Sequence, residues 1–225
     1  MRAVSLSQKG SKSEKNEDAC LVLASKQLFV LADGVGGGPS GDYASRTLVE
    51  QLYEDCSEAK SLTEELILNS IKTANNLIVQ TAQQSERIGM ASTIACAFAH
   101  DGALTTIHVG DSRVYRLRDG ALNRLTRDHV KTIEKQDGSL KQVVTNAIGV
   151  RADLKVEVQN FDWNPDDAFI LCSDGITDVL NDSALLEMLS DQRLSIIDRL
   201  KRILTEAESQ GGRDDKTIIY AFSPQ

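Results

Sequence analysis

Short strand-like segments recur along this chain, and several are joined by tight turns that leave few choices of fold. Asp101-Gly102 and Asp119-Gly120 each separate two such segments by two residues, a strong signal for a β-hairpin. Consecutive hairpins form antiparallel sheet and exclude the parallel sheet of a doubly wound fold. The predicted strands are Ala19–Ala24, Leu28–Ala32, Ser92–Ala99, Ala103–Val109, Arg113–Leu117, Leu122–Leu125, Lys155–Phe161, Ala168–Cys172 and Thr217–Phe222.

Helical patterns occur in two groups, one after the early strands and one near the end of the chain. Apolar residues recur there at steps of three and four, as on the buried face of a helix. The predicted helices are Asp42–Cys56, a helix opened by the capping box Ser61-Leu62-Thr63-Glu64, Ser183–Leu189, and Ser195–Ser209 with Gly211-Gly212 as its stop. The expected fold class is therefore α+β, with sheets packed face to face and helices outside them.

The composition fits one domain covering residues 1–225, which is long enough to bury a substantial core. The formal charge of −8 argues against nucleic acid or an anionic membrane as the main partner. The four cysteines are scattered without a Cys-x-x-Cys pair, so neither a disulfide framework nor a zinc site is expected. The first residues lack the apolar region of a signal peptide, and no apolar stretch is long enough to span a bilayer. We expect a cytoplasmic protein.

Acidic residues stand where predicted strands begin or stop. Because strand ends of packed sheets converge on one edge, these residues can meet although they are remote in sequence. Several adjacent carboxylates cannot all stay ionised unless a cation compensates them, and oxygen ligands without a His or Cys cluster favour Mg²⁺ or Mn²⁺. These residues are Glu17, Asp18, Asp33, Asp111, Asp174, Asp214 and Asp215.

Two simpler interpretations compete with a metal site. A surplus of surface Asp and Glu explains the acidity by itself, and Asp-Gly is a common turn pair, as expected at Asp137-Gly138. Asp33-Gly34 and Asp174-Gly175 differ, because each ends an apolar strand and leads toward a helix. The glycine-rich stretch from Gly34 to Gly41 is equally consistent with close backbone approach to a ligand and with a flexible turn.

Seven short motifs, taken in order, resemble the bacterial metal-dependent protein serine/threonine phosphatases of type 2C, the PPM family. One such motif is weak, but seven in family order cover nearly the whole chain. They are Asn16-Glu17-Asp18-Ala19, Ala32-Asp33-Gly34-Val35-Gly36-Gly37, Gly89-Met90-Ala91-Ser92-Thr93, Val109-Gly110-Asp111-Ser112-Arg113, Leu125-Thr126-Arg127-Asp128-His129, Cys172-Ser173-Asp174-Gly175 and Gly212-Arg213-Asp214-Asp215.

The resemblance implies a four-layer α-β-β-α sandwich with a metal centre at one edge. It implies that Asp33 bridges two metal ions and that Asp174 and Asp214 complete the protein ligands of the first. In such a site the two ions turn a bridging water into hydroxide, which attacks phosphorus in line. No covalent phosphoenzyme is then expected.

The second and third metal ions are assigned by the same resemblance. Asp18, with Glu17 beside it, and the carbonyl of Gly34 are expected to serve the second ion. Asp111, together with Asp174, is expected to hold a third and weaker ion. The expected cofactor is Mn²⁺ or Mg²⁺, two ions in the core site with a possible third.

The chain departs from the family pattern at the phosphate-binding position. Many members carry an Arg five residues before the Asp of the first motif, where this chain has Ser13. Lys12 or Lys15 can supply a point charge instead, or both can be solvated surface residues. The segment Val130–Asn146 is also short for the flap that bacterial members carry there. We expect weaker phosphate affinity than in typical members, with metal-dependent turnover preserved.

Three functions are weighed on this basis. The leading one is an active phosphatase for phosphoserine and phosphothreonine proteins. The alternatives are a non-catalytic binding module that keeps the fold, and a phosphoesterase for non-protein substrates. The resemblance further suggests a cognate Hanks-type kinase as a functional partner, and a monomer is the default state.

Overall fold

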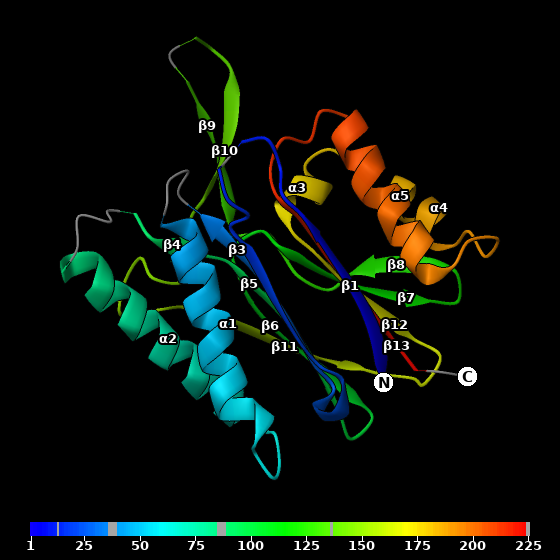
Figure 1. The fold of residues 1–225 in the computed structure, drawn as a ribbon, viewed down its shortest axis with the longest axis horizontal. Helices are drawn as coiled ribbons and strands as arrows, with labels where there is room; N and C mark the ends of the chain where they lie inside the picture. The colour runs from blue at the N-terminus through cyan, green and yellow to red at the C-terminus, as the bar shows by residue number, and fades with distance from the viewer. Residues whose placement is uncertain (13, 36–39, 85–88, 136, 224–225) are drawn as a thin grey trace.

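Two antiparallel sheets form the centre of the molecule (Figure 1). This computed structural model describes residues 1–12, 14–35, 40–84, 89–135 and 137–223. One sheet has six strands in the order β11-β6-β5-β3-β2, with β4 paired to β3, and the other has five in the order β1-β13-β12-β7-β8. The strands are β1 (Arg2–Gln8), β2 (Asp18–Leu23), β3 (Leu28–Val35), β4 (Ala91–Ser92), β5 (Ile94–His100), β6 (Ala103–Val109), β7 (Arg113–Arg118), β8 (Ala121–Arg124), β9 (Val130–Glu134), β10 (Leu140–Val144), β11 (Glu157–Asp162), β12 (Ala168–Cys172) and β13 (Lys216–Phe222).

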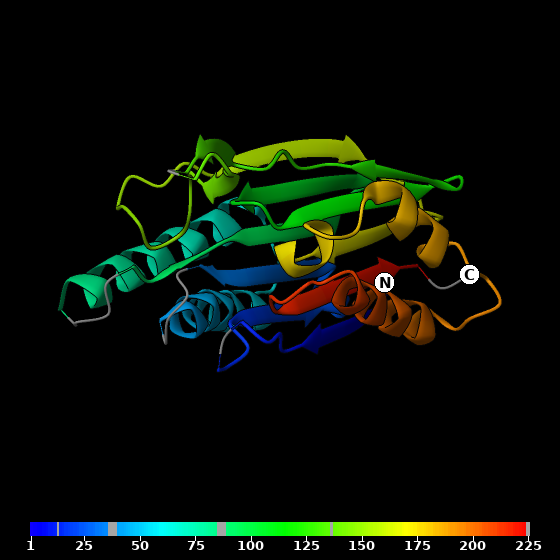
Figure 2. The ribbon, with the colours of Figure 1, turned by 90° about the horizontal axis from the view of Figure 1, so that it is seen from above.

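Helices cover the outer face of each sheet, which confirms the four-layer α-β-β-α sandwich (Figure 1). The long helices α1 (Gly41–Ser57) and α2 (Glu64–Gln84) pack on the six-stranded sheet. The helices α3 (Asp174–Thr177), α4 (Asp182–Leu189) and α5 (Ile196–Ser209) pack on the other, where orange α5 lies beside red β13 (Figure 2). A short 3-10 helix, η1 (Ala24–Lys26), links β2 to β3. Within the described residues, no helix combines the length and apolar character needed to cross a membrane.

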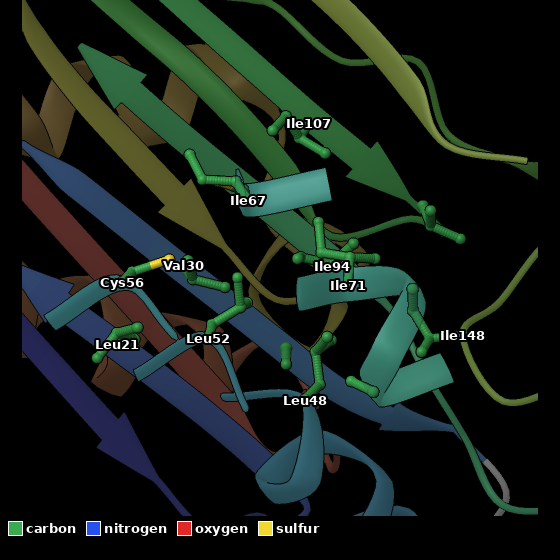
Figure 3. Packing of buried hydrophobic residues seen from close by; sticks show 14 of the residues in the cluster. Leu21, Val30, Leu48, Leu52, Cys56, Ile67, Ile71, Ile94, Ile107 and Ile148 are labelled. Carbon is green, nitrogen blue, oxygen red and sulfur yellow. The ribbon is translucent and has the colours of Figure 1, made fainter. Parts of the chain in front are cut away.

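Alternation of side chains along the strands fills the spaces between the layers. In β3, Val30 packs against α1 and α2, whereas Phe29 and Leu31 lie between the two sheets. Figure 3 shows Val30 in the cluster that also holds Leu48 and Ile71 from these helices. Burying each side chain of this size contributes about 1.5–3 kcal/mol to the stability of the fold. Three apolar clusters, one between the sheets and one under the helices on each side, therefore hold the four layers together.

The predicted turns and helix stop have the expected backbone. Asp101 and Gly102 have φ values of 46° and 75°, and Asp119 and Gly120 have 50° and 73°. Positive φ at both central residues is the type I′ hairpin turn, whose twist matches that of the strands. After α5, the Gly212 N–H donates to the Ala207 carbonyl at 2.9 Å and the Gly211 N–H to Glu208 at 3.0 Å, a Schellman motif.

The predicted capping box was wrong by two residues. Helix α2 begins at Glu64, and Thr63 rather than Ser61 caps it, because the Thr63 hydroxyl accepts the Leu66 N–H at 3.2 Å. Glu64 and Glu65 then lie in the first turn, where carboxylates favour the helix dipole.

Four strands were not predicted from the sequence. The edge strand β1 pairs only with β13, and β4 has two residues. The segment predicted as a short flap forms the ribbon of β9 and β10, which projects away from the sandwich (Figure 1). Its turn at Asp137-Gly138 was expected, and Gly138 has a φ of 79°.

Candidate active site

Asp18 and Asp33 lie opposite each other on neighbouring strands at one end of the six-stranded sheet. Because side chains two residues apart share a face of a strand, Asp33 faces the same way as Phe29 and Leu31, toward the second sheet. Asp18 shares the face of Cys20, which packs in that same layer. Both carboxylates therefore extend the inter-sheet layer at its edge.

Asp174 and Asp214 come from the second sheet at the same edge. Asp174 opens α3 just after β12, and Asp214 precedes β13, which pairs antiparallel with β12. The hydroxyl of Ser173 joins the sheets, since it donates to Asp18 Oδ2 at 2.9 Å and accepts the Thr217 N–H at 2.9 Å. The predicted convergence of strand ends thus brings these acidic residues together.

Asp111 approaches from the turn that follows β6. Gly110, directly before it, has a φ of +107°, and a Cβ there would lie 2.6 Å from the Thr93 methyl group, so only glycine fits. The Thr93 hydroxyl shares a hydrogen bond of 2.7 Å with Ser112 and accepts the Asp33 N–H at 3.1 Å. A single hydroxyl therefore ties the Asp111 turn to the strand that carries Asp33.

Burial and mutual repulsion hold these carboxyl groups away from their ordinary ionisation. Burial, with repulsion from Asp174 and Asp18, raises the pKa of Asp33 well above its usual range. Burial chiefly raises the pKa of Asp174 to about 8 and of Asp18 to about 7. Burial, with repulsion from nearby carboxylates, raises the pKa of Asp111 to about 6. Ionising all of these carboxyl groups therefore costs free energy, and a bound positive charge would reduce that cost.

Three of the carboxylates also hold an oxygen that nothing else uses. Within the described part of the chain, Oδ1 of Asp18, Asp111 and Asp174 is buried without a hydrogen-bond partner. Buried polar atoms are normally satisfied, so three orphan carboxylate oxygens at one edge need an explanation. Hard divalent cations such as Mg²⁺ and Mn²⁺ take such oxygens as ligands, and this donor set fits them.

Asp215, next to Asp214, has a different task that the sequence did not reveal. Its two carboxylate oxygens accept the backbone N–H groups of Gly10 and Glu17, each at 2.7 Å. These bonds fix both ends of the loop between β1 and β2, and so set the entry of β2. The paired acidic residues were visible in the sequence, but which one faced the loop was not.

Glu17 is itself buried, as a ligand or neighbour of the cluster would be. Its side chain lies against Gly41 at the start of α1, and its carbonyl accepts the hydroxyl of Ser45. Burial, then repulsion from Asp215 and Asp42, raises the pKa of Glu17. Its predicted contribution to the second metal ion stays a prediction.

Asp178 is a further acidic neighbour that the sequence analysis missed. It follows Asp174 by four residues, one turn later, and its N–H bonds to the Asp174 carbonyl at 2.8 Å. Its charge repels Asp111 and Asp174. The spacing of four in Asp174-Gly175-Ile176-Thr177-Asp178 was the available signal.

Gly34 lies where three backbone segments meet. A Cβ at this position would lie 2.5 Å from the Gly41 carbonyl oxygen and 2.9 Å from that of Glu17. This crowding by the protein's own backbone explains why residue 34 is a glycine, and both interpretations of the glycine-rich stretch stay predictions. The use of its carbonyl as a metal ligand stays a prediction, and residues 36–39 lie outside the described residues.

The two candidate phosphate-binding lysines occupy different places. The Lys12 ammonium bonds to Asp214 at the edge of the cluster, and its side chain is 61% exposed. Lys15 instead lies 3.5 Å from Asp42 at the start of α1. Of the two, Lys12 is the one beside the carboxylates. Ser13 lies outside the described residues.

A second group of potential ligands involves histidine. Ligand atoms of His108, His129 and Glu157 lie within 4.8 Å of one another. The Gly110 N–H points at His129 Nδ1 at 3.2 Å, so Nε2 carries the proton that His129 shares with Glu157 at 2.9 Å. Both ring nitrogens of His129 are thus hydrogen-bonded, one of them to the Gly110 turn. His108 Nδ1, in contrast, has no partner in the described part of the chain.

Comparison with known proteins identifies the architecture. The sequence profile described as "Protein phosphatase 2C" matches residues 8–211. The chain belongs to this family. Membership of this family implies divalent metal ions, and the carboxylate cluster described above is a group of oxygen donors that fits them.

Relatives within the phosphatase 2C family resemble it over nearly its whole length. The serine/threonine phosphatase stp of Listeria welshimeri is 29% identical, with 97% of this chain and 94% of that protein covered. The serine/threonine protein phosphatase PstP of Mycobacterium tuberculosis is 28% identical over 98% of this chain but only 45% of its own length. The solved structure of PppA from Pseudomonas aeruginosa superimposes with a TM-score of 0.87 at 29% identity, covering 99% of this chain and 97% of that one.

Proposed function

We propose that this phosphatase 2C family member hydrolyses phosphoserine and phosphothreonine in proteins at the edge where Asp18, Asp33, Asp111, Asp174 and Asp214 converge. The observation that carries the proposal is the set of buried carboxylate oxygens at that edge that have no partner among the described residues. Divalent cations, when bound there, lower the pKa of water and offset charge on the phosphoryl oxygens.

The residues of the chain supply positions rather than a nucleophile. We propose that Asp33, Asp174 and Asp214 hold the first ion, and that Asp18, with Glu17 and the Gly34 carbonyl, serves the second. Asp111, beside Asp174, would hold a third, weaker ion. The Ser173 hydroxyl holds the Asp18 carboxylate by a hydrogen bond, and the Thr93 hydroxyl holds the backbone N–H of Asp33.

A cysteine nucleophile has no support in this chain. Burial raises the pKa of all four thiols: Cys172 to about 12, Cys96 further still, and Cys20 and Cys56 above the ordinary value. A nucleophilic cysteine needs a lowered pKa and access to solvent. Hydrolysis by activated water, without a phosphoenzyme, is therefore the chemistry that fits.

The substrate phosphate is proposed to meet Lys12. Its ammonium lies beside Asp214 and is exposed enough to turn toward an incoming phosphate. A lysine offers a point charge instead of the two-pronged grip of an arginine, so phosphate binding should be weaker than in members with that arginine. Lys15, paired with Asp42, is the less favoured residue.

The cellular setting is proposed from the resemblance and from the free cysteines. All four cysteines are free in the structure, which suits a reducing compartment such as the cytoplasm. We propose one domain acting as a monomer on proteins phosphorylated by a Hanks-type kinase.

Hydrolysis of a phosphothreonine peptide tests this function. Activity should require Mn²⁺ or Mg²⁺, vanish with EDTA, and fall at least a hundredfold in Asp33→Asn and Asp174→Asn. Asp166→Asn, an exposed acidic residue away from the cluster, is the matched control and should keep full activity. Peptide binding with no turnover under any metal would favour a non-catalytic module instead, and hydrolysis limited to small phosphoesters would favour a different substrate class.

A further inference from the structure

A pocket of about 630 Å³ lies beside the candidate active site, at the base of the β9–β10 ribbon. Its walls come from three segments: residues 127–130 entering β9, residues 145–146 leaving β10, and residues 151–157 leading into β11. Its volume is within the range of about 300–1,000 Å³ that is usual for ligand pockets. None of the cluster carboxylates lines it.

The pocket carries more free positive charge than its composition suggests. Among its carboxylates, Asp128 is paired with Arg113 at 2.7 Å and with Arg124 at 3.3 Å. Glu157 is hydrogen-bonded to His129 at 2.9 Å. Asp128 is therefore neutralised by arginines, whereas Glu157 keeps its charge because His129 is a neutral donor, and Asp153 is the third acidic residue.

The cations of the wall have no such partners. Arg127, Arg151 and Lys155 are exposed, and none makes an ion pair with any residue that the structure describes. Among the described residues of the wall, three cations without an ion pair face two carboxylates without one, Asp153 and Glu157, which leaves a locally positive surface on a chain of net charge −8. Such a patch attracts an anionic ligand and repels a cationic one.

The pocket is joined directly to the turn that presents Asp111. His129 lies in the pocket wall, and its backbone N–H donates to the Gly110 carbonyl at 2.8 Å while its ring accepts the Gly110 N–H. A chain with its phosphorylated residue at the carboxylate cluster can therefore continue past Asp111 into the pocket. Exposed cations on an open wall suit a solvated peptide segment better than an enclosed small molecule.

We propose that this pocket binds an acidic segment of the phosphoprotein next to the phosphorylated residue, through Arg127, Arg151 and Lys155. The proposal rests on the proposed function and adds a sequence preference to it. Acidic residues near the phosphorylated position should promote hydrolysis by lowering KM, whereas basic residues there should raise it.

Charge-removing variants test the pocket without disturbing the fold. Within the described residues, the side chains of neighbours bond to Arg151 and Lys155 at their backbone carbonyls: Asn75 donates to Arg151 at 3.0 Å and Asn146 to Lys155 at 2.7 Å. Arg151→Gln/Lys155→Gln is therefore compared with Lys60→Gln/Lys72→Gln, which removes the same charge from exposed positions near and on α2. The substrates are two phosphothreonine peptides that differ only in flanking glutamates or lysines, and a small aryl phosphate.

The pocket variant should lose roughly five- to tenfold in kcat/KM on the glutamate peptide, mainly through KM, as expected for two exposed ion pairs. It should keep wild-type activity on the aryl phosphate, and the control variant should match wild type throughout. Equal kcat/KM of wild type and pocket variant on the glutamate peptide would overturn the proposal, as would equal losses on both peptides. If the aryl phosphate is not hydrolysed at all, the proposed function fails. The affinity of the labelled glutamate peptide for wild type, the pocket variant and the control variant, measured by fluorescence anisotropy, then tests the pocket separately.

Discussion

Asp18→Asn should stabilise the metal-free protein while weakening its response to metal. Asp18 is buried, its Oδ2 accepts the Ser173 hydroxyl, and its Oδ1 has no partner in the described part of the chain. An asparagine keeps an oxygen for Ser173 but carries no charge to bury. The substitution therefore removes the cost of burying a charge, together with a smaller repulsion from Asp215 and Asp214, and keeps the hydrogen bond between the sheets.

The size of the effect follows from the pKa of Asp18, which burial raises from 3.8 to about 7. Roughly 3 pK units at about 1.4 kcal/mol each set a ceiling of about 4 kcal/mol. Because neighbouring carboxylates share the same protons, we expect about 1–3 kcal/mol. Between pH 4 and 7 folded Asp18 binds more protons than unfolded Asp18, so its destabilising effect is absent below pH 4 and grows as the pH rises.

Urea unfolding in EDTA at pH 8 and at pH 4 measures this difference, with Asp166→Asn as the surface control. The Asp18→Asn variant should be more stable than wild type at pH 8 and equal to it at pH 4. Saturating Mn²⁺ should reverse the order, since a ligand at a hundred times its Kd adds about 2.7 kcal/mol to the protein that binds it. A variant less stable than wild type in EDTA at pH 8 would refute the reasoning.

Three other perturbations probe separate parts of the site. Thr93→Val leaves the Asp33 N–H and the Ser112 hydroxyl without their shared partner, so it should lower the free energy of unfolding in urea by about 1–3 kcal/mol. The control Thr73→Val, on the exposed face of α2, should change it by less than about 0.5 kcal/mol. Burial lowers the pKa of His108 from 6.5 to about 4, so on acidification the unfolded chain binds a proton at His108 before the folded protein does. Between pH 6.5 and 4 in EDTA, the free energy of unfolding of wild type should therefore fall by roughly 3 kcal/mol relative to that of His108→Gln. Parallel pH profiles of the two proteins would contradict this. Ser13→Arg should lower KM for a small aryl phosphate through a two-pronged grip, and equal Michaelis constants would count against weak phosphate binding in wild type.

The sandwich was predictable because its central strands carry strong local signals. The Asp-Gly pairs at residues 101 and 119 fix hairpins, and apolar runs such as Ala168–Cys172 specify strands buried on both faces. The ribbon Val130–Glu134 with Leu140–Val144 was missed because most of its residues are exposed, so no buried face imposes alternation. Strand β1 is likewise an edge strand, with its apolar residues only partly buried.

The acidic residues of the candidate site were predictable from the sequence, but the hydrogen bonds that hold them in place were not. Acidic residues at strand ends, such as Asp33 and Asp174, are visible as interruptions of apolar runs. Their neighbours are set by tertiary contacts that no local pattern encodes. Asp215 accepts two backbone N–H groups about two hundred positions earlier in the chain. Ser173 donates to Asp18, about one hundred and fifty positions earlier. The pocket of Arg127, Arg151 and Lys155 likewise exists only after three segments meet.

The central claim is that distant carboxylates form one cation site, and anomalous scattering from a crystal grown with Mn²⁺ tests it directly. The account predicts at least two manganese peaks within about 2.5 Å of carboxylate oxygens of Asp33, Asp174 and Asp214. Manganese bound only at His108, His129 and Glu157, with none at the carboxylates, would contradict it.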